Sequence, residues 1–356
     1  MKNILSYKPE ELKELMLSLG EPAYRAKQIF TQLHKGILLD EMTNVGKTTK
    51  EKLHTAVDCS FPTVKRKLVS QIDGTVKYLF SLSDGNCIES VVMKYEHGYT
   101  ICVSSQVGCR MGCKFCASTI AGRVRDLEAG EILGQIISAQ RDMNVRISNV
   151  VMMGIGEPLD NYDNVIDFLS LVNLADGVNI GYRHISLSTC GVVPKIYELA
   201  ELNLPITLSI SLHATDDSIR SEIMPVNKAW GVDELLDACK DYYKITERRM
   251  SFEYTLIEGK NDTKENAIHL ANTLNSKLRS RTETMPIHVN LIPVNEVTES
   301  GFKSSDKGAV KRFAAVLESR GIRATIRRTL GSDINASCGQ LRREDAGETP
   351  SNRAEE

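Results

Sequence analysis

Apolar residues recur at helical spacing in the first part of the chain and at shorter intervals after it. Runs with apolar positions three and four apart predict helices over residues 8–20, 21–36 and 48–57. Between residues 63 and 105 the pattern changes to four short segments rich in Val, Ile, Tyr and Phe, separated by the turn signals DG, DGN and HG. This second pattern predicts an antiparallel meander of four strands.

From residue 116 onward, strand-like and helix-like segments alternate. Repeated β-then-α units predict a parallel sheet with right-handed crossovers, and six of them suit a partial barrel. We therefore expect an α/β fold: a partial (β/α)6 barrel with a small N-terminal helical domain and an antiparallel β extension. The expected boundaries are 1–60 for the helical domain, 61–100 for the extension, 101–343 for the barrel and 344–356 for a polar, disordered tail.

Composition is that of an ordinary globular protein, with 42% hydrophobic and 25% charged residues and a net charge of −2. The net charge alone indicates neither a nucleic-acid partner nor a membrane partner. No run of 18 apolar residues predicts a membrane span, and the first residues lack the apolar region of a signal peptide, so we expect a cytoplasmic protein. Nine cysteines, an odd number, favour metal binding or thiol chemistry over a disulfide framework in that compartment.

Three of the cysteines, Cys109, Cys113 and Cys116, form a C-x3-C-x2-C pattern in which the thiolates can converge on one loop. Zinc sites usually close with four protein ligands, and no fourth ligand stands nearby. A [4Fe–4S] cluster on three cysteines leaves one iron open for a small molecule. The spacing therefore favours an iron–sulfur cluster, with a zinc knuckle or three unrelated cysteines as alternatives.

Polar and glycine residues gather where the expected parallel strands end. The segment VVMMGIGEPLDN ends a strand with Gly156 and Glu157. Ligand-binding loops belong at these strand ends in a barrel. Later strand ends supply further candidates for a ligand site: Ser188, Ser211, Leu212, His213 and Asn295. Tight-turn geometry, turn capping or a core histidine would each explain one of these residues without a ligand.

The cysteine pattern, with Phe115 before its last cysteine, resembles the signature of radical S-adenosylmethionine enzymes. GIGEP, one βα unit later, resembles that superfamily's GGE motif, which binds the methionyl amino group. The resemblance implies a [4Fe–4S] cluster on the three cysteines and reductive cleavage of S-adenosylmethionine to a 5′-deoxyadenosyl radical. It also implies that the strand-end candidates from Gly156 to Asn295 bind S-adenosylmethionine.

Over residues 20–343 the resemblance narrows to the RNA adenine-C2 methyltransferases. It rests on CVSSQVGCRMGCKFCAST, MGIGEPLDN, RHISLSTCGVVP, SISLHA, HVNLIPVN and DINASCGQL. C2 of adenine is electron-poor and cannot readily attack a sulfonium methyl group, whereas a thiolate can. The resemblance implies that Cys338 carries the methyl group as S-methylcysteine, that a second S-adenosylmethionine supplies the radical, and that the product forms through a covalent protein–RNA adduct.

The resemblance assigns the remaining catalytic roles to Cys102 and Glu89. Cys102 would resolve the adduct by forming a transient disulfide with Cys338, and Glu89 would accept the C2 proton. From the pattern alone, Cys102 reads as a buried strand cysteine and Glu89 as a solvent-facing strand residue.

The expected partners are 23S ribosomal RNA, transfer RNA and a low-potential electron donor such as flavodoxin or ferredoxin, acting on a monomer away from membranes. Basic clusters that would suit RNA phosphates, or merely a solvated face, are Lys65–Lys67, Arg323–Arg328 and Arg342–Arg343. Two alternatives remain: the sister family that methylates adenine C8, against which only the proline in GEPL argues, and an iron–sulfur electron carrier.

Overall fold

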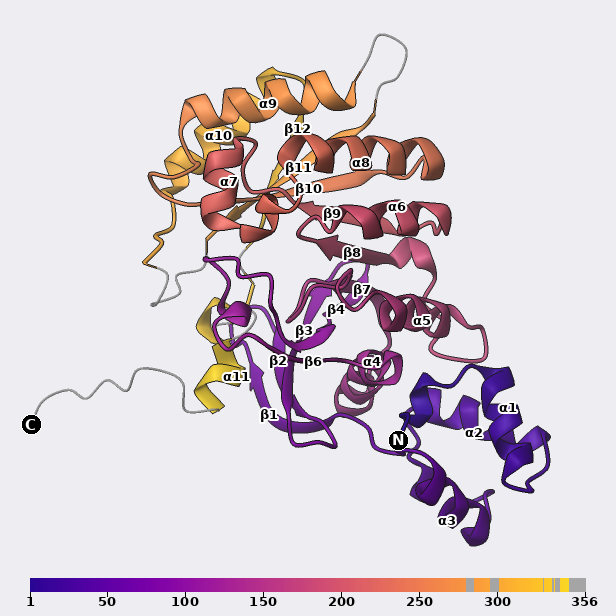
Figure 1. The fold of residues 1–356 in the computed structure, drawn as a ribbon. Helices are drawn as coiled ribbons and strands as arrows, with labels where there is room; N and C mark the ends of the chain where they lie inside the picture. The colour runs from indigo at the N-terminus through magenta and orange to yellow at the C-terminus, as the bar shows by residue number, and fades with distance from the viewer. Residues whose placement is uncertain (280–284, 295–300, 329, 335, 337–339, 346–356) are drawn as a thin grey trace, which may run out of the picture.

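The computed structural model describes residues 1–279, 285–294, 301–328, 330–334, 336 and 340–345. Within them a ten-stranded sheet runs through the molecule in the order β1-β2-β3-β4-β7-β8-β9-β10-β11-β12 (Figure 1). Its strands are β1 (Thr63–Val69), β2 (Val76–Ser81), β3 (Cys87–Tyr95), β4 (Gly98–Cys102), β7 (Ile147–Met152), β8 (Ile185–Thr189), β9 (Thr207–Ser211), β10 (Met250–Leu256), β11 (Ile287–Pro293) and β12 (Arg323–Ile326).

Strand β4 joins two sheet types that the sequence predicted separately. It pairs antiparallel with β3, through Val91 and Cys102, and parallel with β7, through Cys102 and Val151. Every pairing from β4 to β12 is parallel, and the pairings from β1 to β4 are antiparallel. The predicted fold class is confirmed, but the extension and the barrel form one continuous sheet, in which β4 adds a seventh parallel strand.

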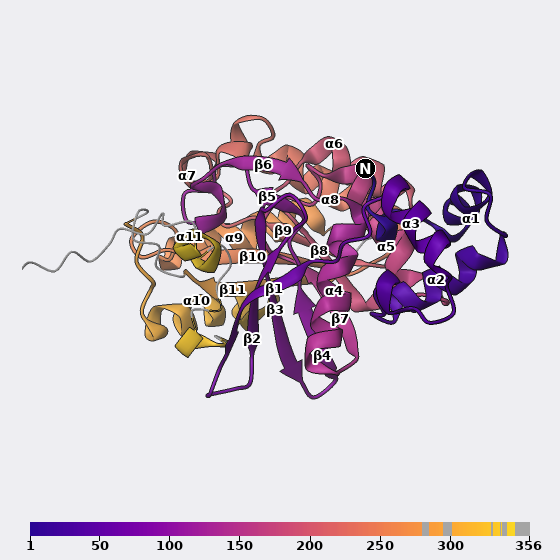
Figure 2. The ribbon, with the colours of Figure 1, turned by 90° about the horizontal axis from the view of Figure 1, so that it is seen from below.

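Helices between the parallel strands cover the outer face of the sheet, as Figures 1 and 2 show. Neighbouring helices pack against each other in the pairs α4·α5, α6·α8, α8·α9 and α9·α10. Their apolar stripes meet β-branched and Leu side chains of the strands in one core. These helices are α4 (Ala129–Met143), α5 (Tyr162–Asn173), α6 (Val193–Glu201), α7 (Asp217–Ile223), α8 (Val232–Thr246), α9 (Lys264–Leu278) and α10 (Lys307–Ser319). Helix α11 (Gln340–Asp345) follows β12 and packs against β3 on the opposite face of the sheet.

The three predicted N-terminal helices are present and lie beside α4 at one end of the molecule (Figure 1). They are α1 (Pro9–Ser18), α2 (Tyr24–His34) and α3 (Lys47–Ala56). The backbone N–H of Asn3 donates to the Glu128 carboxylate at 2.7 Å, and Gly130 N–H donates to Ser6 Oγ at 2.8 Å. A Cβ on Gly130 would lie 2.6 Å from Ser6 N, so α4 meets this region through a glycine. The helical region thus packs directly on the barrel and shares its core.

Elements that lack a strong hydrophobic period were not predicted. These are the short hairpin of β5 (Gln106–Gly108) and β6 (Arg123–Asp126), helix α7, and helix α11 within the region expected to lead into the tail. Each is only three to seven residues long, too short for periodicity to stand out. They matter because β5 leads into the cysteine loop and α11 follows Cys338.

A buried glutamine fixes the junction between the sheet and the cysteine loop. Gln135 of α4 accepts hydrogen bonds from Ser90 Oγ at 2.8 Å and Ser104 N–H at 2.9 Å, and donates to Ser104 O at 2.9 Å. Ser104 Oγ in turn donates to Glu89 O and accepts from Ile155 N–H. Gln135 and Ser104 together therefore connect β3, the segment that follows β4 and the turn after β7.

We expect Gln135→Leu to destabilise the protein by about 3 kcal/mol, because it leaves the Ser90 hydroxyl and the Ser104 amide buried without their partner. Chemical unfolding followed by circular dichroism measures this change. The matched control is Gln32→Leu on α2. The Gln32 side chain donates an exposed hydrogen bond to Asn44, and its loss should cost less than about 0.5 kcal/mol. Equal effects of the two substitutions would contradict the role given to Gln135.

Candidate active site

The cysteine loop runs from Cys109 to Cys116 between β5 and a short 3-10 helix, η3 (Ala117–Thr119). Thr119 Oγ1 donates to Cys113 O at 3.1 Å and to Cys116 O at 2.9 Å, which closes the loop on itself. Lys114 N–H donates to Ile223 O at 2.9 Å, so the loop also rests on the end of α7. Both attachments hold the backbone that carries the three thiols.

The three thiols fit a [4Fe–4S] cluster by their chemistry and their placement. Burial raises the pKa of Cys109 to about 12, and the pKa of Cys113 is raised by burial and by the charges of Cys116 and Cys109. Cys113 and Cys116 belong to one apolar group, and Cys109 precedes them on the same loop. Bound iron would hold such buried thiols as thiolates. Among the described residues no three such side chains are close enough for a single metal ion. A cubane spreads its cysteines over separate irons and needs a wider arrangement.

Glu157 lies in the turn after β7 and is entirely enclosed. Its carboxylate accepts the Cys190 N–H at 2.8 Å and the Leu159 N–H at 3.0 Å, while its own N–H donates to Gln106 Oε1 at 2.9 Å. Burial raises the pKa of Glu157, and these hydrogen bonds oppose that rise. The carboxylate and the backbone N–H of Glu157 together therefore join its own turn to the segment after β8 and to β5.

The glycines of this turn have a packing reason that the sequence did not reveal. A Cβ on Gly154 would lie 2.5 Å from Val103 O, and one on Gly156 would lie 2.7 Å from Gln106 N. Gly156 also has a positive φ of 108°. The turn thus approaches the chain's own 103–106 segment, which leads to the cysteine loop. Arg110 strengthens the same junction, since its Nε donates to Asp160 Oδ2 at 3.0 Å.

Strands β8 and β9 bring the next candidates together. Ser188 Oγ lies 3.4 Å from Ser211 Oγ, so the two hydroxyl groups form one polar site on neighbouring strands. Leu212 and His213 follow directly, and both of their backbone N–H groups donate to Glu253 O. The side chain of Leu212 is buried.

His213 connects this edge of the barrel to the cysteine loop. Its ring meets Phe115 edge-on, with ring centroids 4.9 Å apart and an interplanar angle of 76°. Its Nδ1 accepts the Thr255 N–H at 2.9 Å, so the neutral ring carries its proton on Nε2. Burial and the nearby Arg220 charge lower the pKa of His213 to about 3. The residue has a φ of 58°, a conformation that favours Asn and Gly over most other residues.

The sequence analysis missed Arg220, a fully buried cation beside the cysteine loop. From α7, its guanidinium donates to Leu212 O at 2.9 Å, Cys190 O at 2.7 Å and Asn227 Oδ1 at 2.8 Å. It therefore joins α7 to the segment after β8, the end of β9 and the short 3-10 helix Pro225–Lys228. Its charge lowers the pKa of Cys113, although burial dominates that thiol. Helix α7 has only seven residues, too few for a periodic pattern to single out Arg220 in the sequence.

Glu89 and Cys102 lie on adjacent strands of the concave face. Glu89 is buried, with a side chain 1% exposed, and its carboxylate lies 3.2 Å from Lys77 Nζ, which is equally buried. Cys102 packs with Val91 and Met93. The pattern alone predicted a solvent-facing strand residue at Glu89, and this prediction is wrong because the side chain is buried.

The C-terminal segment crosses this same face. Ala336 and Leu330 pack against the apolar group of Cys102, Val91 and Met93. On the other side of residues 337–339, Arg342 N–H donates to Glu89 Oε1 at 2.6 Å. Cys338 and Asn295, two residues that the sequence analysis placed in the site, lie outside the described residues.

Comparison with known proteins decides the family. Residues 103–271 match the model of the radical SAM superfamily, and residues 2–58 match the ribosomal RNA large subunit methyltransferase N-terminal domain. A probable dual-specificity RNA methyltransferase RlmN from Clostridium novyi is 53% identical over 96% of this chain and 98% of its own length. Its counterpart from Clostridium tetani is also 53% identical, over 96% of both chains. The chain belongs to the RlmN family of radical SAM RNA methyltransferases.

A solved structure agrees with this membership. The crystal structure of a radical SAM methyltransferase from Sphaerobacter thermophilus matches with a TM-score of 0.89 and 38% identity, over 96% of this chain and 99% of that chain. Membership in the RlmN family makes this chain an enzyme that methylates RNA, which excludes the electron carrier considered from the sequence. It also implies a [4Fe–4S] cluster and S-adenosylmethionine. None of the described helices is both long and apolar enough to cross a bilayer.

We expect His213 to make the protein less stable in acid. The unfolded histidine takes up a proton below pH 6.5, but the folded one stays neutral down to about pH 3. The free energy of unfolding therefore decreases as the pH is lowered from 6.5 to 3. The slope from one such group is about 1.4 kcal/mol per pH unit. His213→Asn keeps an acceptor for Thr255 N–H and suits the backbone, and should flatten the slope by that amount in unfolding curves at pH 4.5–6.5. An unchanged slope would show that the folded histidine titrates normally.

Proposed function

We propose that this enzyme methylates C2 of adenosine in 23S ribosomal RNA and in transfer RNA next to the anticodon. The observation that carries the proposal is the crossing of the C-terminal segment over β3 and β4. Residues on both sides of Cys338 lie beside the two side chains that the proposed chemistry uses: Ala336 packs against the apolar group that contains Cys102, and Arg342 N–H donates to Glu89. The described residues that flank Cys338 in the sequence are therefore anchored beside the proposed resolving thiol and the proposed base, which supports a methyl-carrying role for Cys338.

In this proposal, Cys109, Cys113 and Cys116 hold the cluster. When bound, the cluster supplies the electron that cleaves S-adenosylmethionine to a carbon radical. The Glu157 turn with Gly156 binds the methionyl end. The strand-end groups of Ser188, Ser211, Leu212, His213 and Asn295 bind the remainder. The paired hydroxyl groups of Ser188 and Ser211 suit a ribose or carboxylate partner.

The thiol of Cys338 takes the first methyl group, because a thiolate is the better nucleophile for the sulfonium carbon. The carbon radical from S-adenosylmethionine takes one hydrogen atom from this methyl group, and the resulting S-methylene radical bonds to C2 and joins the protein to the RNA. The adduct radical then loses one electron, which the oxidised cluster would accept. Glu89 then accepts the C2 proton. Its position next to Lys77 Nζ supports this role, since a buried carboxylate must be paired to stay ionised.

Cys102 completes the cycle by attacking the sulfur of Cys338. A sulfur–sulfur bond forms, the bond from Cys338 sulfur to the methylene carbon breaks, and that carbon takes a proton to become the methyl group of the product. The proposal includes a low-potential donor such as flavodoxin or ferredoxin for the electrons, and a cytoplasmic monomer as the working form.

The site of methylation separates this proposal from its closest rival. Mass spectrometry of nucleosides from RNA treated with the holoenzyme should show 2-methyladenosine, and Cys338→Ala should abolish it because no methyl carrier remains. Finding 8-methyladenosine instead would assign the chain to C8 chemistry. Full methylation by the Cys338→Ala variant would overturn the covalent route.

Cys102→Ala should trap the RNA on the protein, since the adduct cannot be resolved without the second thiol. Denaturing gel electrophoresis with labelled RNA should then show a covalent complex that nuclease shortens. The control is Cys239→Ala, a buried cysteine on α8 in the general core. This control should release free methylated RNA. Recovery of only free RNA from Cys102→Ala would remove the resolving role from this residue.

A further inference from the structure

The barrel lumen opens to solvent away from the cysteine loop, through a cavity of about 380 Å3. Its lining comes from β3, β4, β7, β8, β9 and β10, and includes Thr100, Asn149 and Thr207 near the starts of their strands. Ser186 and Ser209, which also line it, lie one inward-facing step before Ser188 and Ser211 on the same strands. The cavity therefore continues the proposed cofactor site toward the opposite end of the barrel.

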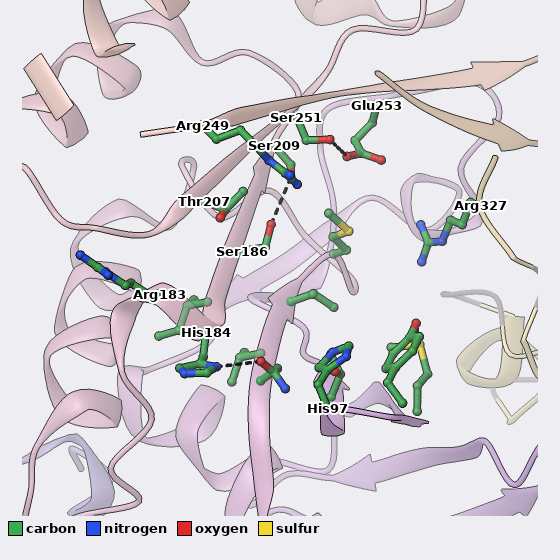
Figure 3. A pocket seen from close by; sticks show the side chains of 18 residues that line it. His97, Arg183, His184, Ser186, Thr207, Ser209, Arg249, Ser251, Glu253 and Arg327 are labelled. Atoms are coloured by element: carbon green, nitrogen blue, oxygen red, sulfur yellow. Dashed lines mark hydrogen bonds between the residues drawn. The ribbon is translucent and has the colours of Figure 1, made fainter. Parts of the chain in front are cut away.

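Basic and aromatic side chains surround this opening. We call His97, Arg183, His184, Arg249 and Arg327 the basic rim. His97 directly precedes β4, and Arg183 and His184 directly precede β8. Arg249 directly precedes β10, and Arg327 follows β12. Figure 3 shows the arginines around an open space from different sides, with Ser186, Ser209 and Ser251 between them.

The arginines of the rim differ from the basic residues that the sequence singled out. Lys65 and Lys67 of β1 lie 2.7 Å and 2.6 Å from the carboxylates of Asp345 and Asp142. No ion pair joins Arg183, Arg249 or Arg327 to a carboxylate among the described parts of the chain, and all three are exposed. The charges of Arg183 and Arg249 are available to an anionic ligand, whereas those of the two lysines are largely neutralised. Arg327 shares the cavity with Glu253, and its charge opposes the rise that burial causes in the pKa of that carboxyl group.

An exposed aromatic pair provides a second, independent feature. The rings of Tyr95 and His97 stack in parallel, with centroids 5.2 Å apart and an interplanar angle of 10°. Both line the cavity, and Tyr95 is 37% exposed. Stacked aromatic side chains beside arginines are the combination that proteins use to hold single-stranded nucleic acid.

The inner wall of the cavity reaches the proposed reaction centre. Met93, Val151 and Met153 line the cavity, and the same three side chains pack in the apolar group that contains Cys102 and Ala336. A flat base that enters from the rim would therefore pass along an apolar wall toward Cys102. Its charged phosphates would stay outside, at the arginines.

We propose that the basic rim and the Tyr95–His97 pair bind the single-stranded RNA that flanks the target adenosine, so that the base enters the lumen from this end. The inference rests on the proposed function and adds the route of the substrate to it. The cavity suits one flipped nucleotide and excludes a duplex, because its volume lies at the lower end of small-ligand sites. S-adenosylmethionine and RNA then approach the reaction centre from opposite ends of the lumen.

Binding of a 20-nucleotide single-stranded RNA, followed by fluorescence anisotropy at several salt concentrations, tests this route. Replacing Arg183, Arg249 and Arg327 together with Gln should weaken binding at least about tenfold and lower the slope of log K against log salt by about 2. The matched control is Lys311→Gln, an exposed lysine on α10 outside the cavity lining, which should leave the affinity and the slope unchanged.

The aromatic pair gives a test that charge does not affect. Tyr95→Ala should weaken binding about tenfold, whereas Tyr95→Phe keeps the ring and should bind like the parent protein. Iron and sulfide content and the thermal midpoint of each variant show whether it is folded. Folded variants with the parent affinity and slope would overturn the route. The methylated position made by the unaltered holoenzyme tests the proposed function separately, so the two failures are distinguishable.

Discussion

The pairing of β4 with β3 on one side and with β7 on the other is the constraint on which the site depends. It makes an antiparallel extension and a parallel barrel into one curved sheet. Because alternate residues of a strand share a face, Glu89, Val91 and Met93 of β3 line up with Thr100 and Cys102 of β4 on the concave side. A register slip of one residue in β4 would turn Cys102 toward the outer helices and separate it from Glu89.

Buried charged groups on this scaffold each join segments that are distant in the sequence. Glu157 binds the amides after β7 and β8, Arg220 binds the carbonyls after β8 and β9, and Glu89 binds Lys77 and the amide of Arg342. Burying such groups costs several kcal/mol each unless their hydrogen bonds are made. Here the backbone makes most of those bonds, which fixes the loops around the centre at the expense of stability.

The sequence predicted the regular elements well because their periods are strong. The three N-terminal helices appear close to their expected ranges, and the four meander strands and the six later parallel strands are all present. It did not reveal that β4 would pair with β7, since register and neighbour choice depend on contacts distant in the chain. Arg220 and Gln135 were missed for the same reason: their roles come from carbonyl and amide groups that only the fold brings to them.

The glycines of the Glu157 turn show how one pattern can have two physical causes. Glycine at the end of a parallel strand predicts close approach by a ligand, yet Gly154 and Gly156 are required first by the 103–106 backbone beside them. The two causes are compatible, because that backbone leads to the cysteine loop and so brings the turn to the cluster. In the proposed site, tight packing between the turn and the loop would let Glu157 and a cluster held by Cys109 contact the same small molecule.

In the two proposals, the thiol of Cys338 reacts with two substrates that reach it from opposite ends of the lumen. In the proposed cycle, position 338 meets a sulfonium methyl group first and an adenine ring second, and both are planar or charged groups that would compete for one entrance. The proposed cofactor site lies at the strand ends near Ser188 and Ser211, whereas four of the five residues of the basic rim precede β4, β8 or β10. Ala336 packs with the Cys102 group and Arg342 N–H binds Glu89, so the described residues on both sides of position 338 are anchored on the concave face between the two ends.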